Sequence, residues 1–203
     1  MRGTLVLSVI CLLTLAWAIP ARAQFDRSDI HRPFAFDVYG GGHKFEGSDE
    51  TGLGFGARLL LNHRSGLAFG GNFTWVTRTE ELLAGEQDVN VYYYNAELEY
   101  TFPGGMIEPF LGAGAGAATV KLGDVEGGGT LQLASTPGTD KTYLMVPLSA
   151  GGRIYNTTRS IGVVVEVRDH VVFVSEDEDA GIDSDTTHGW SIGAGVSFQF
   201  GGP

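Results

Sequence analysis

Hydrophobic and polar side chains alternate along most of the chain after residue 33. The segment 190–200, for example, has an apolar residue at every second position, with Ser, Gly or Gln between them. Successive side chains of a β-strand point to opposite faces, so this period of two predicts strands, and few segments show a helical period. We expect eight strands, at residues 34–42, 52–61, 67–77, 89–102, 107–120, 143–155, 161–173 and 190–200.

The connections between these segments alternate in length. Those at 62–66, 103–106 and 156–160 are short, whereas those at 43–51, 78–88, 121–142 and 174–189 are long. Barrels of the outer membrane have short periplasmic turns and long external loops, and an even number of strands puts both termini on the side of the short turns. The pattern predicts an all-β chain that folds as a single up-and-down antiparallel transmembrane β-barrel of eight strands.

The two faces of the expected strands differ in composition. One face is aliphatic and aromatic, and the other consists mainly of Gly, Ala, Ser and Asn with isolated charges. A soluble ligand-carrying barrel also alternates, but its outer face would be rich in Lys, Glu and Thr. Small residues suit a narrow lumen, so we expect the apolar face to contact lipid.

Aromatic residues on the apolar face separate into two groups. Such residues form girdles at the two interfaces of a membrane barrel, whereas core aromatics of a soluble β-protein need not separate in this way. The expected girdles are Phe34, Phe36, Tyr100, Phe102, Phe198 and Phe200 at the short-turn end, and Trp75, Tyr92 and Trp190 at the long-loop end.

The N-terminus has the pattern of a secretory signal peptide. Arg2 precedes an apolar segment at 5–19, which is short for an uncleaved anchor helix, and Ala21-Arg22-Ala23 offers a cleavage site. We therefore expect a cleaved signal peptide at 1–23, a lead-in at 24–33, a barrel at 34–200 and a short tail at 201–203. The single cysteine, Cys11, would be removed, which excludes a disulfide, a thiolate metal site or a cysteine nucleophile in the mature chain.

The net charge is strongly negative. The chain has 13 Lys and Arg against 24 Asp and Glu, and loss of Arg2 and Arg22 would leave 11 − 24 = −13. This charge argues against nucleic acid as a partner. No residue pattern indicates a cofactor.

Charged residues also fall on the face expected to line the lumen. A charge buried there costs free energy unless it is paired or hydrated, so an ion-pair network that plugs the lumen is the expected arrangement, with a gate or ion path as the alternative. The inward charges are Asp37, Arg58, Glu97, Glu99, Glu108, Arg153, Glu166 and Arg168. The shear of the barrel, which the sequence does not give, decides which of them pair.

Two further groups of residues could form sites. Acidic residues alternate in the segment 176–185, at Asp177, Asp179, Asp183 and Asp185. They could bind a hard cation such as calcium, but the match to a calcium loop is poor and a solvated acidic loop is the alternative.

The second group concerns catalysis. His170 is expected to point inward near the outer rim, and His188 lies beside the last strand, but nothing fixes a serine next to either histidine. We therefore expect no catalytic residues. Asp169 is unusual, because its parity places it on the lipid face.

Three stretches resemble outer-membrane β-barrel families that include the OmpA membrane domain, OmpX and OmpW: residues 109–116, 166–169 and the closing strand 193–200. The resemblance implies that the barrel-assembly machinery reads a terminal aromatic residue, here Phe200, although Gly201-Gly202-Pro203 follow it. Outer-membrane lipid and lipopolysaccharide are the expected surroundings, and the sequence names no extracellular partner. We expect a structural or surface-interaction role, with a narrow pore or small-solute channel as the alternative and a lipid-modifying enzyme or protease as a remote one.

Overall fold

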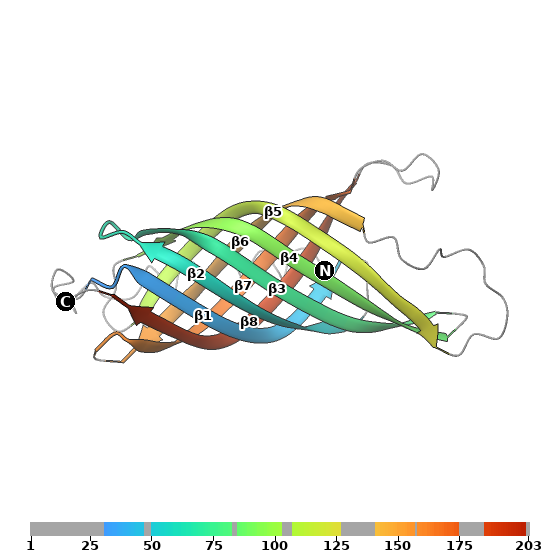
Figure 1. Cartoon of the computed structure of the whole chain (residues 1–203), viewed down its shortest axis with the longest axis horizontal. Coiled ribbons are helices and arrows are strands. Elements are labelled where there is room, and N and C mark those ends of the chain that lie inside the picture. The colour runs from blue at the N-terminus through green and yellow to red at the C-terminus, as the bar shows by residue number, and fades with distance from the viewer. Residues whose placement is uncertain are drawn as a thin grey trace, which may run out of the picture.

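The computed structural model of the chain describes residues 31–46, 50–82, 85–102, 107–126, 141–156, 158–174 and 185–201. These residues form one closed barrel in which each strand pairs with its neighbours in sequence and β1 pairs with β8 (Figure 1). The predicted eight-stranded up-and-down antiparallel barrel is therefore confirmed. The strands are β1 (Phe34–Phe45), β2 (Thr51–Asn62), β3 (Leu67–Leu82), β4 (Gly85–Thr101), β5 (Ile107–Glu126), β6 (Lys141–Tyr155), β7 (Ile161–Val174) and β8 (Asp185–Phe200).

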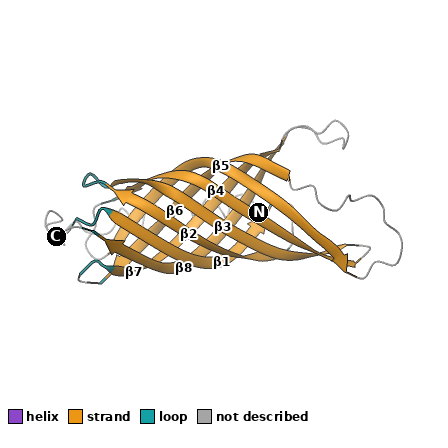
Figure 2. Cartoon of the chain, in the orientation of Figure 1, coloured by secondary structure: helices purple, strands orange, loops and turns teal. Residues whose placement is uncertain are grey.

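The barrel closes through a long antiparallel ladder between the first and last strands. Phe34 pairs with Phe200 at one end of this ladder, and Phe45 pairs with Gly189 at the other. Closure leaves no sheet edge, so the backbone groups of the strands bond to one another rather than to solvent. Figure 2 shows strands and their connecting turns, and none of the described residues belongs to a helix long and apolar enough to cross a membrane.

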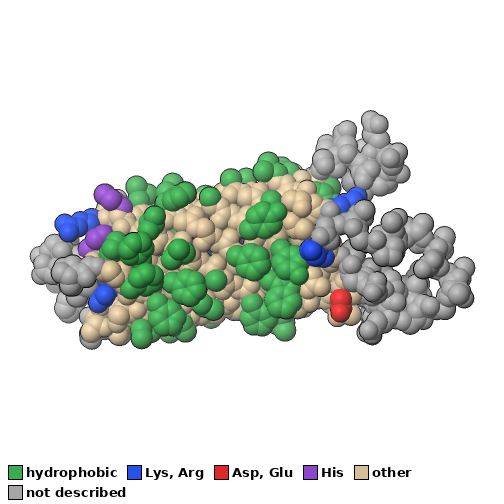
Figure 3. All heavy atoms as spheres, in the orientation of Figure 1, with side chains coloured by type: hydrophobic (Ala, Val, Ile, Leu, Met, Phe, Trp, Pro, Cys, Tyr) green, Lys and Arg blue, Asp and Glu red, His purple; other side chains and the backbone are tan. Residues whose placement is uncertain are grey.

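Burial follows the predicted period of two. On β7, Val163 and Val165 are 51% and 48% exposed on the outside, whereas Val164 between them is fully buried. Large apolar side chains cover the outer surface of the barrel between its two ends (Figure 3). The assignment of the apolar face to the outside is therefore confirmed.

The connection expected at 78–88 is not a long loop. β3 and β4 continue to Leu82 and Gly85 as a paired hairpin, in which the Thr79 hydroxyl donates to Asp88 Oδ1 at 2.9 Å. The residues of this extension are mostly polar, and the apolar outer face does not continue along it. The alternation that predicted the strands therefore ends before the strands do.

The lumen contains more apolar volume than the sequence suggested. Toward the long-loop end, Val76, Val91, Tyr93 and Met145 point inward and belong to a buried cluster that also includes Val89, Ala118 and Val172. A smaller cluster of Ala35, Leu60 and Ala68 lies toward the short-turn end. The expectation of a lumen lined mainly by small residues was wrong at the level of the larger cluster, where side chains such as Tyr93 and Met145 fill the barrel.

Candidate functional site

A buried cluster of charges occupies the lumen between these two apolar clusters. It draws on five strands, because β1, β2, β4, β6 and β7 each contribute at least one side chain at a position that parity turns inward. We call it the lumen network, and its members are Asp37, Arg58, Glu97, Glu99, Arg153, Glu166 and Arg168. Each of these residues is at most 3% exposed. Their charges must therefore be compensated within the barrel.

Arg153 organises the level of the network nearest the short turns. Its Nη1 and Nη2 donate to the two carboxylate oxygens of Glu99 at 2.6 and 2.8 Å, and Nη2 also donates to Asp37 Oδ2 at 2.9 Å. These three residues lie on β6, β4 and β1. One guanidinium thus links strands from opposite parts of the barrel wall.

Arg168 organises the deeper level in the same way. Its Nη1 and Nη2 donate to the two oxygens of Glu97 at 2.9 and 3.2 Å, and its Nε donates to Glu166 Oε1 at 3.3 Å. The Ser149 hydroxyl also donates to Glu97, at 3.1 Å. Bidentate pairing of this kind fixes both partners, because the planar guanidinium matches the geometry of a carboxylate.

Arg58 connects the two levels. Its Nη2 lies 2.7 Å from Asp37 Oδ2, and its Nη1 lies 3.2 Å from Glu97 Oε1 and 3.1 Å from Glu166 Oε2. The Phe110 ring covers this region, with its centroid 5.1 Å from Arg58 Cζ and 4.3 Å from Arg153 Cζ. The network is therefore continuous across the barrel and backed by an aromatic ring. Sequence reasoning did not single out Phe110, although it shares the inward parity of Glu108.

Glu108, the eighth predicted inward charge, is buried but does not join the lumen network. It forms an ion pair with Arg159, which lies in the turn between β6 and β7. Arg159 is therefore a base at the mouth of the barrel that the predicted inward charges did not include. Turn residues have no strand parity, so the alternation could not show that Arg159 reaches into the mouth of the barrel.

Within the network, three arginines face four carboxylates, which leaves a formal charge of 3 − 4 = −1.

An aromatic cluster lies beyond the network, toward the long-loop end. His43, Tyr93 and His170 are fully buried, the rings of Tyr93 and His170 stack with centroids 4.0 Å apart, and Tyr93 Oη lies 3.1 Å from His43 Nε2. His170 thus lies inside the barrel, where its parity placed it. His43 and Tyr93 were not singled out, but their parity relative to Asp37 and Asn95 gives the same inward assignment.

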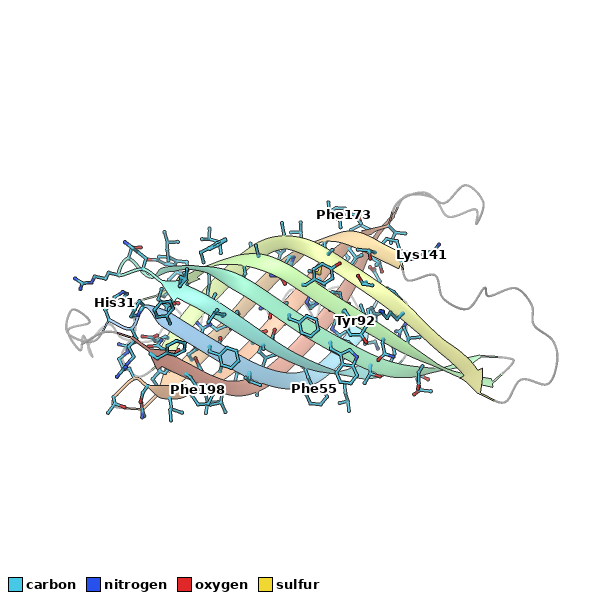
Figure 4. All side chains as sticks on the ribbon, viewed as in Figure 1. His31, Phe55, Tyr92, Lys141, Phe173 and Phe198 are labelled. Atoms are coloured by element: carbon cyan, nitrogen blue, oxygen red, sulfur yellow. The ribbon has the colours of Figure 1, made fainter. Side chains whose placement is uncertain are left out.

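The outer face places the predicted aromatic residues near the two ends of the barrel. Phe198 lies toward the short-turn end and Tyr92 toward the other (Figure 4). Phe34 and Phe200 stack with centroids 5.6 Å apart, and Trp75 Nε1 donates to Asn90 Oδ1 at 2.9 Å. The remaining members also lie on this face: Phe36, Tyr100, Phe102 and Trp190.

Asp169 lies on the outer face, as its parity indicated, next to His188. His188 Nδ1 is 2.9 Å from Asp169 Oδ2, and the His188 ring stacks on Trp190 with centroids 6.2 Å apart. The pairing of β7 with both neighbours is regular at Asp169, so no bulge turns the side chain outward. The histidine covers the carboxylate, which remains only 7% exposed.

Other predicted features fall partly outside the described residues. Asp177, Asp179 and Asp183 lie outside them, as do the signal peptide and the start of the lead-in, while Asp185 begins β8 opposite Val174. Among the described residues, no group of three or more His, Cys, Asp or Glu is placed to hold a metal ion. Phe200, the predicted assembly signal, is the last residue of β8.

Comparisons with known proteins agree with this architecture. The chain matches the family described as the outer membrane protein beta-barrel domain over residues 7–201. A comparison with curated proteins finds no match. Among solved structures, the chain is similar to neisserial surface protein A, with 16% identity and a TM-score of 0.63 over 83% of this chain and 97% of that one. It is also similar to OprG of Pseudomonas aeruginosa, with 15% identity and a TM-score of 0.51 over 85% and 98% of the two chains. At these identities the likeness concerns the fold.

Proposed function

Because the chain belongs to the outer membrane protein β-barrel domain family, we propose that it is a structural or surface-interacting barrel of the outer membrane whose lumen is closed to solutes. The observation that supports closure is the lumen network. Its three arginines are each at most 3% exposed, and they bind carboxylates from several strands at two connected levels. A solute passing along the axis would have to separate these pairs, which is costly in a buried site.

A second layer supports the same proposal. The apolar cluster around Val76, Tyr93 and Met145 lies on the long-loop side of the network, and all three residues are fully buried. An eight-stranded barrel is just wide enough for its inward side chains to fill it. Water therefore meets an apolar layer from one side and a charged layer from the other. This arrangement favours closure over the alternative of a narrow pore or small-solute channel.

The extension of β3 and β4 supports a role at the cell surface. Trp75 pairs with Tyr92 at the level of the long-loop girdle, and the pairing continues from there to Leu82 and Gly85. At about 3.3 Å per residue this is roughly 20 Å of strand beyond the girdle. Figure 1 shows these strands and β5 reaching past their neighbours at the right-hand end. A projection of this length offers partners a surface outside the lipid.

The described histidines do not form a catalytic triad: Ser65 Oγ lies 2.9 Å from His63 Nδ1 in an exposed turn, but no described carboxylate bonds to that ring. His188 Nδ1 lies next to Asp169, and His170 Nδ1 lies 3.3 Å from the Gly189 carbonyl oxygen. No described serine hydroxyl forms a hydrogen bond to either ring, so neither histidine has a serine nucleophile placed for activation. We therefore assign no catalytic residues.

Solute flux into proteoliposomes tests closure. We expect vesicles that contain the refolded wild-type chain to admit a small sugar no faster than protein-free vesicles. A matched preparation with an open porin serves as the positive control. Rapid, size-dependent uptake through the wild-type chain would contradict closure and favour the channel.

A further inference from the structure

A pocket of about 320 Å³ opens at the short-turn end of the barrel, on the opposite side of the lumen network from the apolar cluster. Arg153 and Tyr155 line its inner part, and the lead-in and the turns after β2 and β6 supply much of the rest. His31, labelled in Figure 4, lies at this end, where Figure 3 shows basic and histidine side chains together. Short turns face the periplasm in outer-membrane barrels, so the pocket faces that compartment.

The lining of this pocket is basic, although the whole chain carries a net charge of −11. Among the described residues it contains one carboxylate, from Glu108, and a larger set of bases: His31, Arg32, His63, Arg64, Arg153 and Arg159. Arg153 and Arg159 already have carboxylate partners. Arg32 and Arg64 form no ion pair with any described residue. Two guanidinium charges at the pocket are therefore not compensated by the described part of the chain.

Arg32 is held in place by backbone groups rather than by an acid. Its Nη2 donates to the Thr158 carbonyl at 3.1 Å, while the Asn62 amide donates to the Arg32 carbonyl at 3.2 Å. The Arg32 Nε is buried and has no hydrogen-bond partner among the described residues. These contacts with Thr158 and Asn62 hold the Arg32 side chain at the pocket without neutralising its charge.

Arg159 shows a second sign of a constrained site. Its φ of 54° is the one positive value among described residues other than glycine. The left-handed region favours Gly, Asn or Asp, and a residue kept there at a cost is held by its surroundings. Here the constraint places the Arg159 guanidinium against Glu108 at the wall of the pocket.

We propose that this pocket binds a small anion that presents several phosphate or carboxylate oxygens, with Arg32 and Arg64 as its main contacts. Guanidinium groups pair with such oxygens in a planar, often bidentate geometry. The pocket is at the lower end of the size range of small-molecule sites, which suits a compact polyanion. The proposal does not depend on closure of the lumen, since Arg32 and Arg64 lie in the lead-in and in the turn after β2, outside the network.

Calorimetric titration of the refolded full chain with pyrophosphate and with citrate tests the proposal. The protein is held in uncharged maltoside micelles at low ionic strength. Wild type should bind at least one of the two anions, and Arg32→Gln and Arg64→Gln should each weaken that binding about tenfold or more, as expected for loss of a charge-assisted hydrogen bond. Arg64 is exposed, so its substitution leaves the barrel wall unchanged.

Lys44→Gln is the matched control, because Lys44 is exposed near the other end of β1 and the substitution removes the same charge. It should change the affinity less than twofold. An absence of binding to both anions, or an equal loss in Lys44→Gln, would overturn the proposal.

Adding lysophosphatidylglycerol to the micelles distinguishes the sources of the anion. Competition that Arg32→Gln removes would identify a lipid headgroup phosphate, and lack of competition would identify a soluble periplasmic anion.

Discussion

At the scale of single residues, arginine rather than lysine supplies every positive charge of the lumen network. Its planar guanidinium has five donors, so one side chain can bind carboxylates from two or three strands at once. Arg58 does this by contacting Asp37, Glu97 and Glu166 together. Because the network already has one more carboxylate than arginine, loss of any arginine makes its net charge more negative.

Substitution of Arg168 tests this imbalance. Arg168→Met should destabilise the barrel by about 3–5 kcal/mol, the usual cost of leaving a buried charge without its partner. The double variant Arg168→Met with Glu97→Gln has two arginines and three carboxylates, so the net charge of the network returns to −1. It should lower the free energy of unfolding by less than Arg168→Met alone. Equilibrium refolding into lipid vesicles measures both. A double variant less stable than Arg168→Met alone would show that the two residues contribute independently.

Strand parity predicted which way the charges point but not which of them meet. Asp37, Glu97 and Arg58 could be placed in the lumen from their neighbours alone. That Arg58 contacts both carboxylates could not be predicted, because the contacts depend on the shear of the barrel. The pair of Glu108 with Arg159 could not be predicted, because Arg159 comes from a turn. The pair of Asp169 with His188 joins two strands whose relative register was not known from the sequence.

At the scale of the strand, the strength of the hydrophobic alternation depends on what surrounds the strand. Alternation is strong where one face contacts lipid and fades where both faces meet water, as in β3 beyond Arg78. All eight strands could therefore be predicted, but the ends of β1, β3, β4, β5 and β8 on the long-loop side could not. The inward residue Val76 was also missed as a lumen residue, because an apolar residue on the second face of a strand weakens the alternation.

The depth of β7 in the membrane gives a test of the two faces. Ile161 pairs with Phe198 of one girdle and Asp169 pairs with Trp190 of the other, so Val165 lies midway between them. Val165→Arg should cost about 2–4 kcal/mol, as expected for a lipid-facing charge at the midplane.

Gly193→Ser is the comparison on the inner face of the neighbouring strand. A Cβ there would lie 3.3 Å from the Gly40 carbonyl oxygen and 3.7 Å from Tyr39 Cδ2, which requires only a small adjustment. Its cost should be far below that of Val165→Arg when both are measured by refolding into vesicles. Equal costs would mean that the two faces are reversed.

At the scale of the whole molecule, the two ends of the barrel differ in chemistry. The short-turn end has the lumen network and a basic pocket, whereas the long-loop end has an apolar interior and a projecting hairpin. This difference between the two ends, together with membership of the outer membrane protein β-barrel domain family, predicts the orientation of the chain. The hairpin should face the outside of the cell and the basic pocket the periplasm.

Cysteine labelling tests this orientation. The one native cysteine, Cys11, lies in the predicted signal peptide, so Thr79→Cys in the β3–β4 hairpin and Ser65→Cys in the turn after β2 each introduce a single thiol into the mature chain. Both positions are exposed. A membrane-impermeant maleimide should label Thr79→Cys on intact cells and Ser65→Cys only after the outer membrane is permeabilised. The reverse pattern would show that the barrel is inserted in the opposite direction.

Single-channel recording in planar bilayers tests closure of the lumen most directly. The refolded wild type is compared with Arg153→Ala and Arg168→Ala, which remove the organising base of each level of the network. We predict a wild type that is closed or opens only briefly, and larger or longer openings in at least one variant, because an unpaired carboxylate attracts water and cations. A steady, large wild-type conductance that neither substitution changes would contradict closure of the lumen and would make the chain a channel.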